Sequence, residues 1–209
     1  MSEYNHLIDT NKLPSMKEIV SRMSMEDVNS LGEGCWLTDM AILFGFSMIQ
    51  HEILHDLDMI YFMEPSVVNM VLRSKGKSLV IVFVKSAQYY YLDSSFTRKN
   101  FKDAGVFCER LHSALHPQMR NTKHNLSVLS VPSQTNNNDC GVYLLFYAQI
   151  VATNLKRMYG HAVGSGFTPF GVANVINQRV RDIMTIKPIP NGSKYREKLN
   201  SRIMACISL

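Results

Sequence analysis

The sequence predicts one globular domain that combines several helices with a few short strands. The chain has 209 residues, of which 46% are hydrophobic and 19% charged, so it is long enough to bury a single core. Short runs rich in β-branched and aromatic residues, typical of strands, separate longer runs with the spacing of helices. We expect the domain to span residues 1–209, with the polar stretch 1–15 loosely held.

The first half of the chain predicts three helices and a strand pair. The apolar run 40–50 predicts a helix, and Thr38 or Asp39 is placed to cap its first turn. Residues 78–84 form an apolar run continuous enough for a strand buried on both faces. The expected elements are helices over 15–24, 40–50 and 67–73, the last opened by Pro65, and strands over 78–84 and 88–92 with a turn at 85–87.

The second half predicts a strand between two longer helices and then two closing helices. Apolar residues recur with helical spacing over 100–116, and the run after Cys140 is apolar on nearly every face, as in a buried helix. Gly160 is placed to end that helix. The expected elements are helices over 100–116, 142–155, 172–184 and 193–207, a strand over 126–131 and a loop over 160–171.

Cys140 stands where a polar run changes into this buried helix. Unpaired backbone N–H groups and the helix dipole favour an anion at a helix N-terminus, so we expect the Cys140 thiolate, the nucleophilic form, to be favoured there. Gln134, six residues earlier, can point its amide at the same place as half of an oxyanion hole. The alternative is that Cys140 is a small buried apolar residue.

Other candidate residues also have two interpretations. Trp36, the only tryptophan, lies just before the helix over 40–50 and either packs in the core or lines a binding surface. Asp93 ends a predicted strand and is either functional or a turn-capping aspartate. His51 and His55 lie four residues apart without an HExxH frame, so we expect surface residues and no metal site.

Composition limits the cellular compartments and the kinds of partner that we expect for this protein. Four scattered cysteines without CxxC spacing, and no stretch with the features of a signal peptide, predict a reducing intracellular location, nuclear or cytoplasmic. No stretch approaches the roughly 20 apolar residues that span a membrane. The net charge of +5 is mild and dispersed, and such a surface suits an acidic protein partner as well as nucleic acid. We expect a protein partner, and no nucleic acid, membrane, metal or small-molecule cofactor.

Taken together, three motifs resemble those of the Ulp/sentrin-type cysteine proteases, which process SUMO, the neddylation modifier and related tags. The motifs are Trp36-Leu37-Thr38-Asp39 before a helix, Tyr91-Leu92-Asp93-Ser94 at a strand end, and Gln134 six residues before Cys140-Gly141. The similarity covers about residues 30 to 157, and the length is close to that of the small deneddylase branch.

The resemblance implies an α+β, papain-like fold with a central mixed β-sheet flanked by helices. It also implies catalytic roles: Cys140 attacks the carbonyl after a Gly-Gly tail, Gln134 stabilises the oxyanion, and Asp93 orients a histidine. In the family a tryptophan beside that histidine forms one wall of the tunnel for the tail, and Trp36 matches the other wall. Asp39 and Lys77 are then candidate substrate-binding residues.

The sequence departs from the family at the catalytic base. Gly76 occupies the position expected for the histidine, and Lys77 the position of the neighbouring tryptophan. No histidine occurs between His55 and His112, so a shifted alignment does not recover one. A lysine is cationic in its usual state and cannot take up a proton.

Three hypotheses about function follow. The first is a catalytically impaired Ulp-like protein, a pseudoprotease that binds a protein partner such as a ubiquitin-like modifier. The second is an active thiol isopeptidase with Cys140 as nucleophile, whose base comes from a partner chain or from another histidine such as His112 or His116. The third is a structural subunit that binds through a surface unrelated to the cleft.

Overall fold

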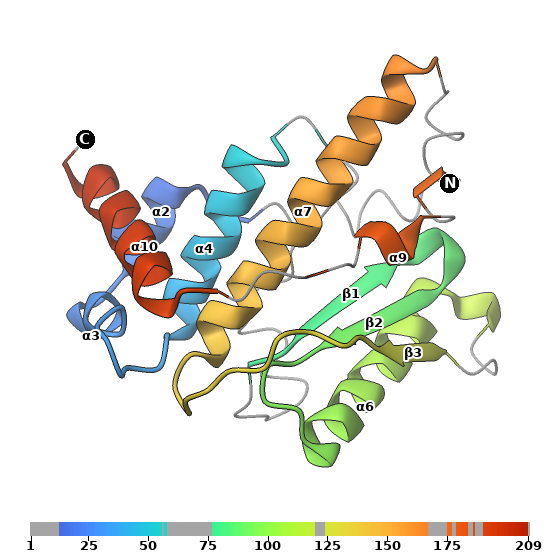
Figure 1. The fold of residues 1–209 in the computed structure, drawn as a ribbon, viewed down its shortest axis with the longest axis horizontal. Coiled ribbons are helices and arrows are strands. Elements are labelled where there is room, and N and C mark those ends of the chain that lie inside the picture. Colours follow the sequence, from blue (N-terminus) through green and yellow to red (C-terminus); the bar gives the residue numbers. More distant parts are fainter. Residues whose placement is uncertain are drawn as a thin grey trace.

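Helices pack on both faces of a small sheet, which confirms the α+β fold class (Figure 1). The computed structural model describes residues 13–55, 57, 77–119, 124–166, 175–176, 179–183, 186 and 190–208. The polar stretch 1–12, the predicted helix over 67–73 and Gly76 lie outside these described residues.

The sheet is mixed and has three strands within the described residues, in the order β1-β2-β3. Strands β1 (Leu79–Phe83) and β2 (Gln88–Leu92) pair antiparallel, and β3 (Asn125–Val128) pairs parallel to β2. A 3₁₀ turn, η1 (Val84–Ser86), and a left-handed Ala87 connect β1 to β2. The prediction that residues 78–84 are buried on both faces was wrong: in β1 only Leu79 is buried, and β1 is an edge strand of the sheet that the described residues form.

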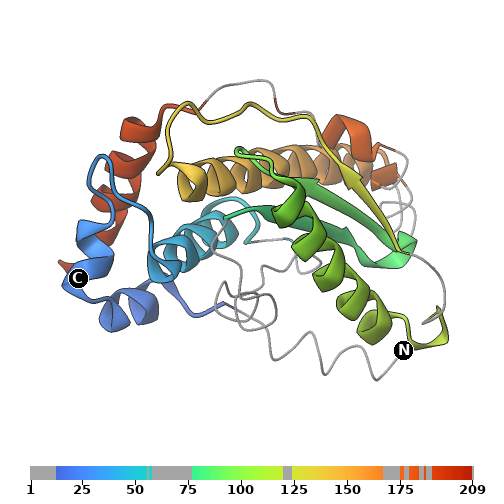
Figure 2. The same cartoon turned by 90° about the horizontal axis from the view of Figure 1, so that it is seen from below.

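One face of the sheet is covered by helix α6 (Arg98–Leu115), which Thr97 caps. Tyr89 of β2 packs there against Phe107 and Cys108 of α6 in a small apolar cluster. Figure 2 shows α6 on one side of the strands and α7 on the other. The 3₁₀ helix η2 (Pro117–Met119) follows α6 and packs against it.

The main core lies on the other face, around helices α4 (Asp39–Glu52) and α7 (Cys140–Gly164). Thr38, and not Asp39, caps α4: its side chain accepts a hydrogen bond from the N–H of Ala41. The two helices approach closely at Gly45, where an added Cβ would lie 2.5 Å from Cδ1 of Leu145. The apolar residues predicted for both helices therefore pack against each other in the core.

The remaining helices border this core. The predicted helix over 15–24 is two helices, α2 (Met16–Arg22) and α3 (Met25–Asn29), because Ser24 begins a second capping box with Asp27. Helix α10 (Gly192–Ile207) agrees with its prediction and packs against α2 and α7. Of the predicted helix over 172–184, the described part contains α9 (Val180–Ile183).

Helix α7 is longer than predicted. It continues through Gly160 to Gly164, although Gly160 was expected to end it and residues 160–171 to form a loop. A glycine inside a helix costs only about 1 kcal/mol relative to alanine. The burial of Met158 and Ala162 on either side of Gly160 outweighs that cost.

Candidate functional site

Cys140 is the first residue of α7 and is half-buried. The next residue, Gly141, packs closely on Leu37: an added Cβ would lie 3.0 Å from the Leu37 Cβ. A side chain at position 141 would separate the two segments. This close contact brings the segment that carries Trp36 to the start of α7.

Burial raises the pKa of the Cys140 thiol. Hydrogen bonds from the backbone N–H groups of Lys77 and Gly141 and the charge of Lys77 act in the opposite direction, whereas the negative charge of Asp93 adds to the increase. The expectation of a favoured thiolate was therefore wrong. Removal of the sulfur from water outweighs the electrostatic help of the helix N-terminus.

Lys77 links the thiol to the start of α4. Its backbone N–H contacts the Cys140 sulfur, and its ammonium forms an ion pair with the carboxylate of Asp39. The sequence predicted both Lys77 and Asp39 as separate substrate-binding residues. In the structure their charges are directed at each other.

Asp93 lies within electrostatic reach of Cys140, and its carboxylate is held by its own neighbourhood. One oxygen accepts hydrogen bonds from the Tyr91 hydroxyl at 2.6 Å and the Asn100 amide at 3.3 Å. The other accepts the backbone N–H of Ser95 at 2.8 Å. The capping interpretation of Asp93 therefore describes its hydrogen bonds with the described residues, which come from residues 91–100.

Both the oxygen and the nitrogen of the Gln134 side-chain amide form hydrogen bonds. Its carbonyl oxygen accepts the Ser94 hydroxyl at 2.6 Å, and its nitrogen donates to the Asn136 carbonyl at 2.6 Å. Its backbone N–H also donates to the Ser94 carbonyl, 3.0 Å away. These bonds tie the segment before Cys140 to the turn after Asp93 and leave one amide N–H of Gln134 for other partners.

Trp36 is exposed over 56% of its surface, so the core-packing interpretation of this residue was wrong. Its neighbour Leu37 is buried and supplies the apolar anchor instead. An exposed large aromatic side chain next to the start of α7 is the kind of residue that dominates protein interfaces.

The histidines that the sequence offered as a replacement base lie away from α7. His112 is buried on α6 and pairs with the Tyr89 hydroxyl at 3.0 Å, on the face of the sheet opposite α7. His116 is one turn further along, with its ring next to that of His112. His51 and His55 are exposed, as predicted.

Within the part of the chain that the structure describes, no three His, Cys, Asp or Glu side chains are grouped to hold a metal ion. In the same residues no helix is both long and apolar enough to cross a membrane.

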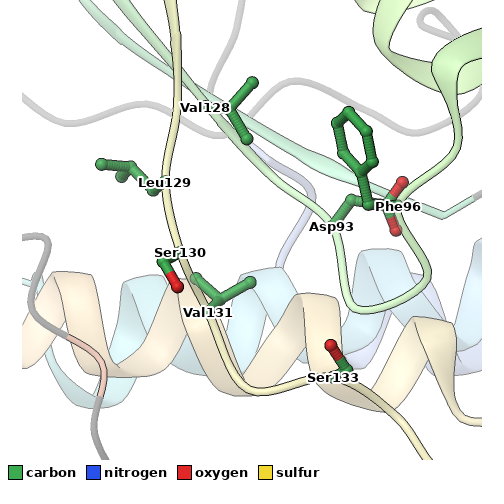
Figure 3. A pocket seen from close by; sticks show the side chains of 7 residues that line it. All are labelled: Asp93, Phe96, Val128, Leu129, Ser130, Val131 and Ser133. Carbon is green, nitrogen blue, oxygen red and sulfur yellow. The ribbon is translucent and has the colours of Figure 1, made fainter.

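A pocket borders the site on the side of Asp93. Figure 3 shows Asp93 and Phe96 on one side of it and the segment from Val128 to Ser133 on the other. Phe96 and Val128 are exposed apolar side chains. The surface next to Asp93 is therefore partly apolar.

Sequence reasoning missed Arg196. Its guanidinium is buried beside the site and pairs with Asp139, the residue before Cys140, at 2.8 Å. Arg196 stands in the apolar stripe of α10 with Leu199 and Ile203, at the spacing of residues on one helix face. A cation within an apolar stripe is the signal that could have revealed it, because buried charges need partners.

Residues 77–158 match the family model described as the Ulp1 protease family, C-terminal catalytic domain. This segment is therefore similar to the catalytic domain of that family. The matched segment contains Lys77, Asp93, Gln134 and Cys140, whereas Trp36 and Arg196 lie outside it. No curated protein matched the chain.

Because burial raises the pKa of Cys140, alkylation of this thiol by iodoacetamide should increase with pH to an inflection above about 8.5, the value of a free cysteine. Lys77→Met should raise the inflection further by removing a positive charge, and Asp93→Asn should lower it by removing a negative one. Peptide mass mapping of the alkylated sites measures Cys140 separately from the other three cysteines. An inflection below about 8.5 in the wild-type protein would contradict a raised pKa for Cys140.

Proposed function

We propose that this Ulp-type domain is a pseudoprotease that binds a protein partner, the C-terminal tail of a ubiquitin-like modifier, without cleaving it. The observation that carries the proposal is the position of Lys77. It contacts the Cys140 sulfur through its backbone and directs its side chain to Asp39. A cation bound to a carboxylate thus stands where the family has the tryptophan next to its catalytic histidine.

Among the residues that the structure describes, the other groups that act on the thiol do not supply a base. Besides Lys77 these are the Gly141 N–H, a donor, and Asp93, whose two oxygens accept three hydrogen bonds. A positioned base contributes roughly 10² to 10⁴ in rate. Without one, Cys140 remains a thiol of raised pKa, which reacts with small electrophiles at high pH and does not sustain efficient proteolysis.

The described residues include features that suit the binding of a protein partner. Trp36 is exposed beside the site, and the contact between Leu37 and Gly141 holds its segment against α7. The candidate tails are those of the neddylation modifier and SUMO. The four free thiols support action inside the cell, in the nucleus or cytoplasm.

We expect the purified protein to bind at least one of SUMO, the neddylation modifier and ubiquitin, and to leave a C-terminally extended form of it uncleaved. Trp36→Ala should weaken that binding about tenfold, since buried aromatic anchors carry much of the energy of an interface. Ile207→Ala is the matched control, because Trp36 and Ile207 are both 56% exposed and Ile207 is the last residue of α10. Calorimetric titration measures binding, and intact mass measures cleavage.

Cleavage that disappears in Cys140→Ala would overturn the proposal in favour of an active isopeptidase. A third outcome would favour the hypothesis of a structural subunit over both others. If Trp36→Ala combined with Asp39→Arg leaves the capture of the cellular partner unchanged, the surface around Trp36 and Asp39 is not the binding surface.

A further inference from the structure

Arg196 is the most enclosed charged side chain beside the site, with 4% of its surface exposed. Its guanidinium donates 2.8 Å and 3.3 Å hydrogen bonds to one oxygen of Asp139, from Nη2 and Nε. Nη2 also lies 3.4 Å from the Asn138 carbonyl. One side of the guanidinium is therefore bound to the two residues that precede Cys140.

The other side of the guanidinium holds the segment that precedes Trp36. Nη1 donates to the carbonyls of Ser30 at 2.9 Å and Gly32 at 3.1 Å, and Nη2 donates to the Cys35 carbonyl at 2.6 Å. Cys35 is the residue directly before Trp36. A single planar group thus bridges the loop that precedes Cys140 and the loop that precedes Trp36.

The carboxylate of Asp139 is oriented toward Arg196 and not toward the start of α7. It occupies the N-cap position of α7, yet its side chain caps no N–H of that helix. Its oxygens instead accept from Arg196 and, at 2.9 Å, from the Asn136 amide. Gly192, the first residue of α10, lies against the same carboxylate: an added Cβ would be 2.4 Å from Oδ2. The first residue of α10 and Arg196 in its second turn therefore both contact the loop before Cys140, where the start of α10 lies near the start of α7 (Figure 1).

We propose that Arg196 is a positioning residue of the cleft, which sets the distance between the Trp36 wall and the Cys140 thiol through this bridge. The inference rests on the proposed function for its consequence in binding, although the bridge itself does not depend on it. A lysine at this position would keep the charge opposite Asp139 but could not serve both loops, because an ammonium lacks the planar fork of arginine. Helix α10, outside the segment that matches the family, then completes the site.

The test uses two variants that alter the bridge in different ways, Arg196→Lys and Gly192→Ala. Arg202→Ala is the matched control, since Arg202 lies on the same helix, is half exposed and pairs with Glu52 at 2.9 Å. Trp36 is the only tryptophan, so the decay of its fluorescence anisotropy reports the motion of its loop alone. The second measurement is the alkylation rate of Cys140, and the third is modifier affinity by calorimetry.

Both test variants should add a fast component to the Trp36 anisotropy decay, change the Cys140 alkylation rate and weaken modifier binding about tenfold, while Arg202→Ala matches the wild type. Wild-type values for anisotropy and alkylation in both folded variants would overturn the inference. So would global unfolding of both variants, because Arg196 would then act on the whole core. If the wild type binds no modifier, the proposed function fails, and the first two measurements still decide whether the bridge positions the two loops.

Discussion

The double substitution Gly76→His with Lys77→Trp is expected to raise the rate at which Cys140 reacts with a vinyl-sulfone or propargyl modifier probe by roughly 10² to 10⁴, the contribution of a positioned base. The new histidine would precede the residue whose N–H contacts the sulfur. The new tryptophan would remove the ion pair between Lys77 and Asp39 and would supply the side chain that the resemblance led us to expect at this position. Intact mass over time gives the rate for each of the three modifiers.

Two controls make the result specific. Cys140→Ser in the repaired background should abolish the adduct. Asp93→Asn in that background should remove most of the gain, because a histidine base needs an acceptor to hold its orientation, and the bond from Tyr91 already fixes the Asp93 carboxylate. A repaired protein that binds a modifier but gains no reactivity would show that the absent histidine is not what limits chemistry in this domain.

Leu145→Ala is expected to destabilise the protein by about 2 to 5 kcal/mol, the usual cost of truncating a fully buried leucine. Leu145 fills the space above Gly45 where α4 and α7 come closest. These helices begin at Asp39 and Cys140, so their contact also sets the geometry of the site. Urea unfolding followed by circular dichroism measures the change, and Val163→Ala on the exposed face of α7 is the matched control.

A second substitution tests the cause of that loss. Gly45→Ala alone should also destabilise, because its methyl group would overlap the Leu145 side chain. The double variant Gly45→Ala with Leu145→Ala should be more stable than the sum of the two single changes predicts, since the new methyl occupies part of the vacated space. Strict additivity would show that the two positions do not share one packing contact.

Much of the fold could be predicted because its elements have strong local signals. The strand at 88–92 and the helices at 40–50, 100–116 and 193–207 agree with β2, α4, α6 and α10 to within a few residues. The predictions failed where a local signal was opposed by packing. Gly160 does not end α7 because its neighbours are buried, and residues 78–84 are not buried on both faces because β1 lies at the edge of the sheet that the described residues form.

The sequence by itself indicated the candidate site residues: Cys140 at a helix start, Asp93 at a strand end, Gln134 between them in the chain, and Lys77 where the resemblance led us to expect a tryptophan. Only the tertiary structure decided how they act, because pKa values and hydrogen bonds depend on neighbours that are distant in the chain. Burial raises the Cys140 pKa against the helix dipole, Lys77 is bound to Asp39, and Arg196 joins two loops more than 100 residues apart in sequence.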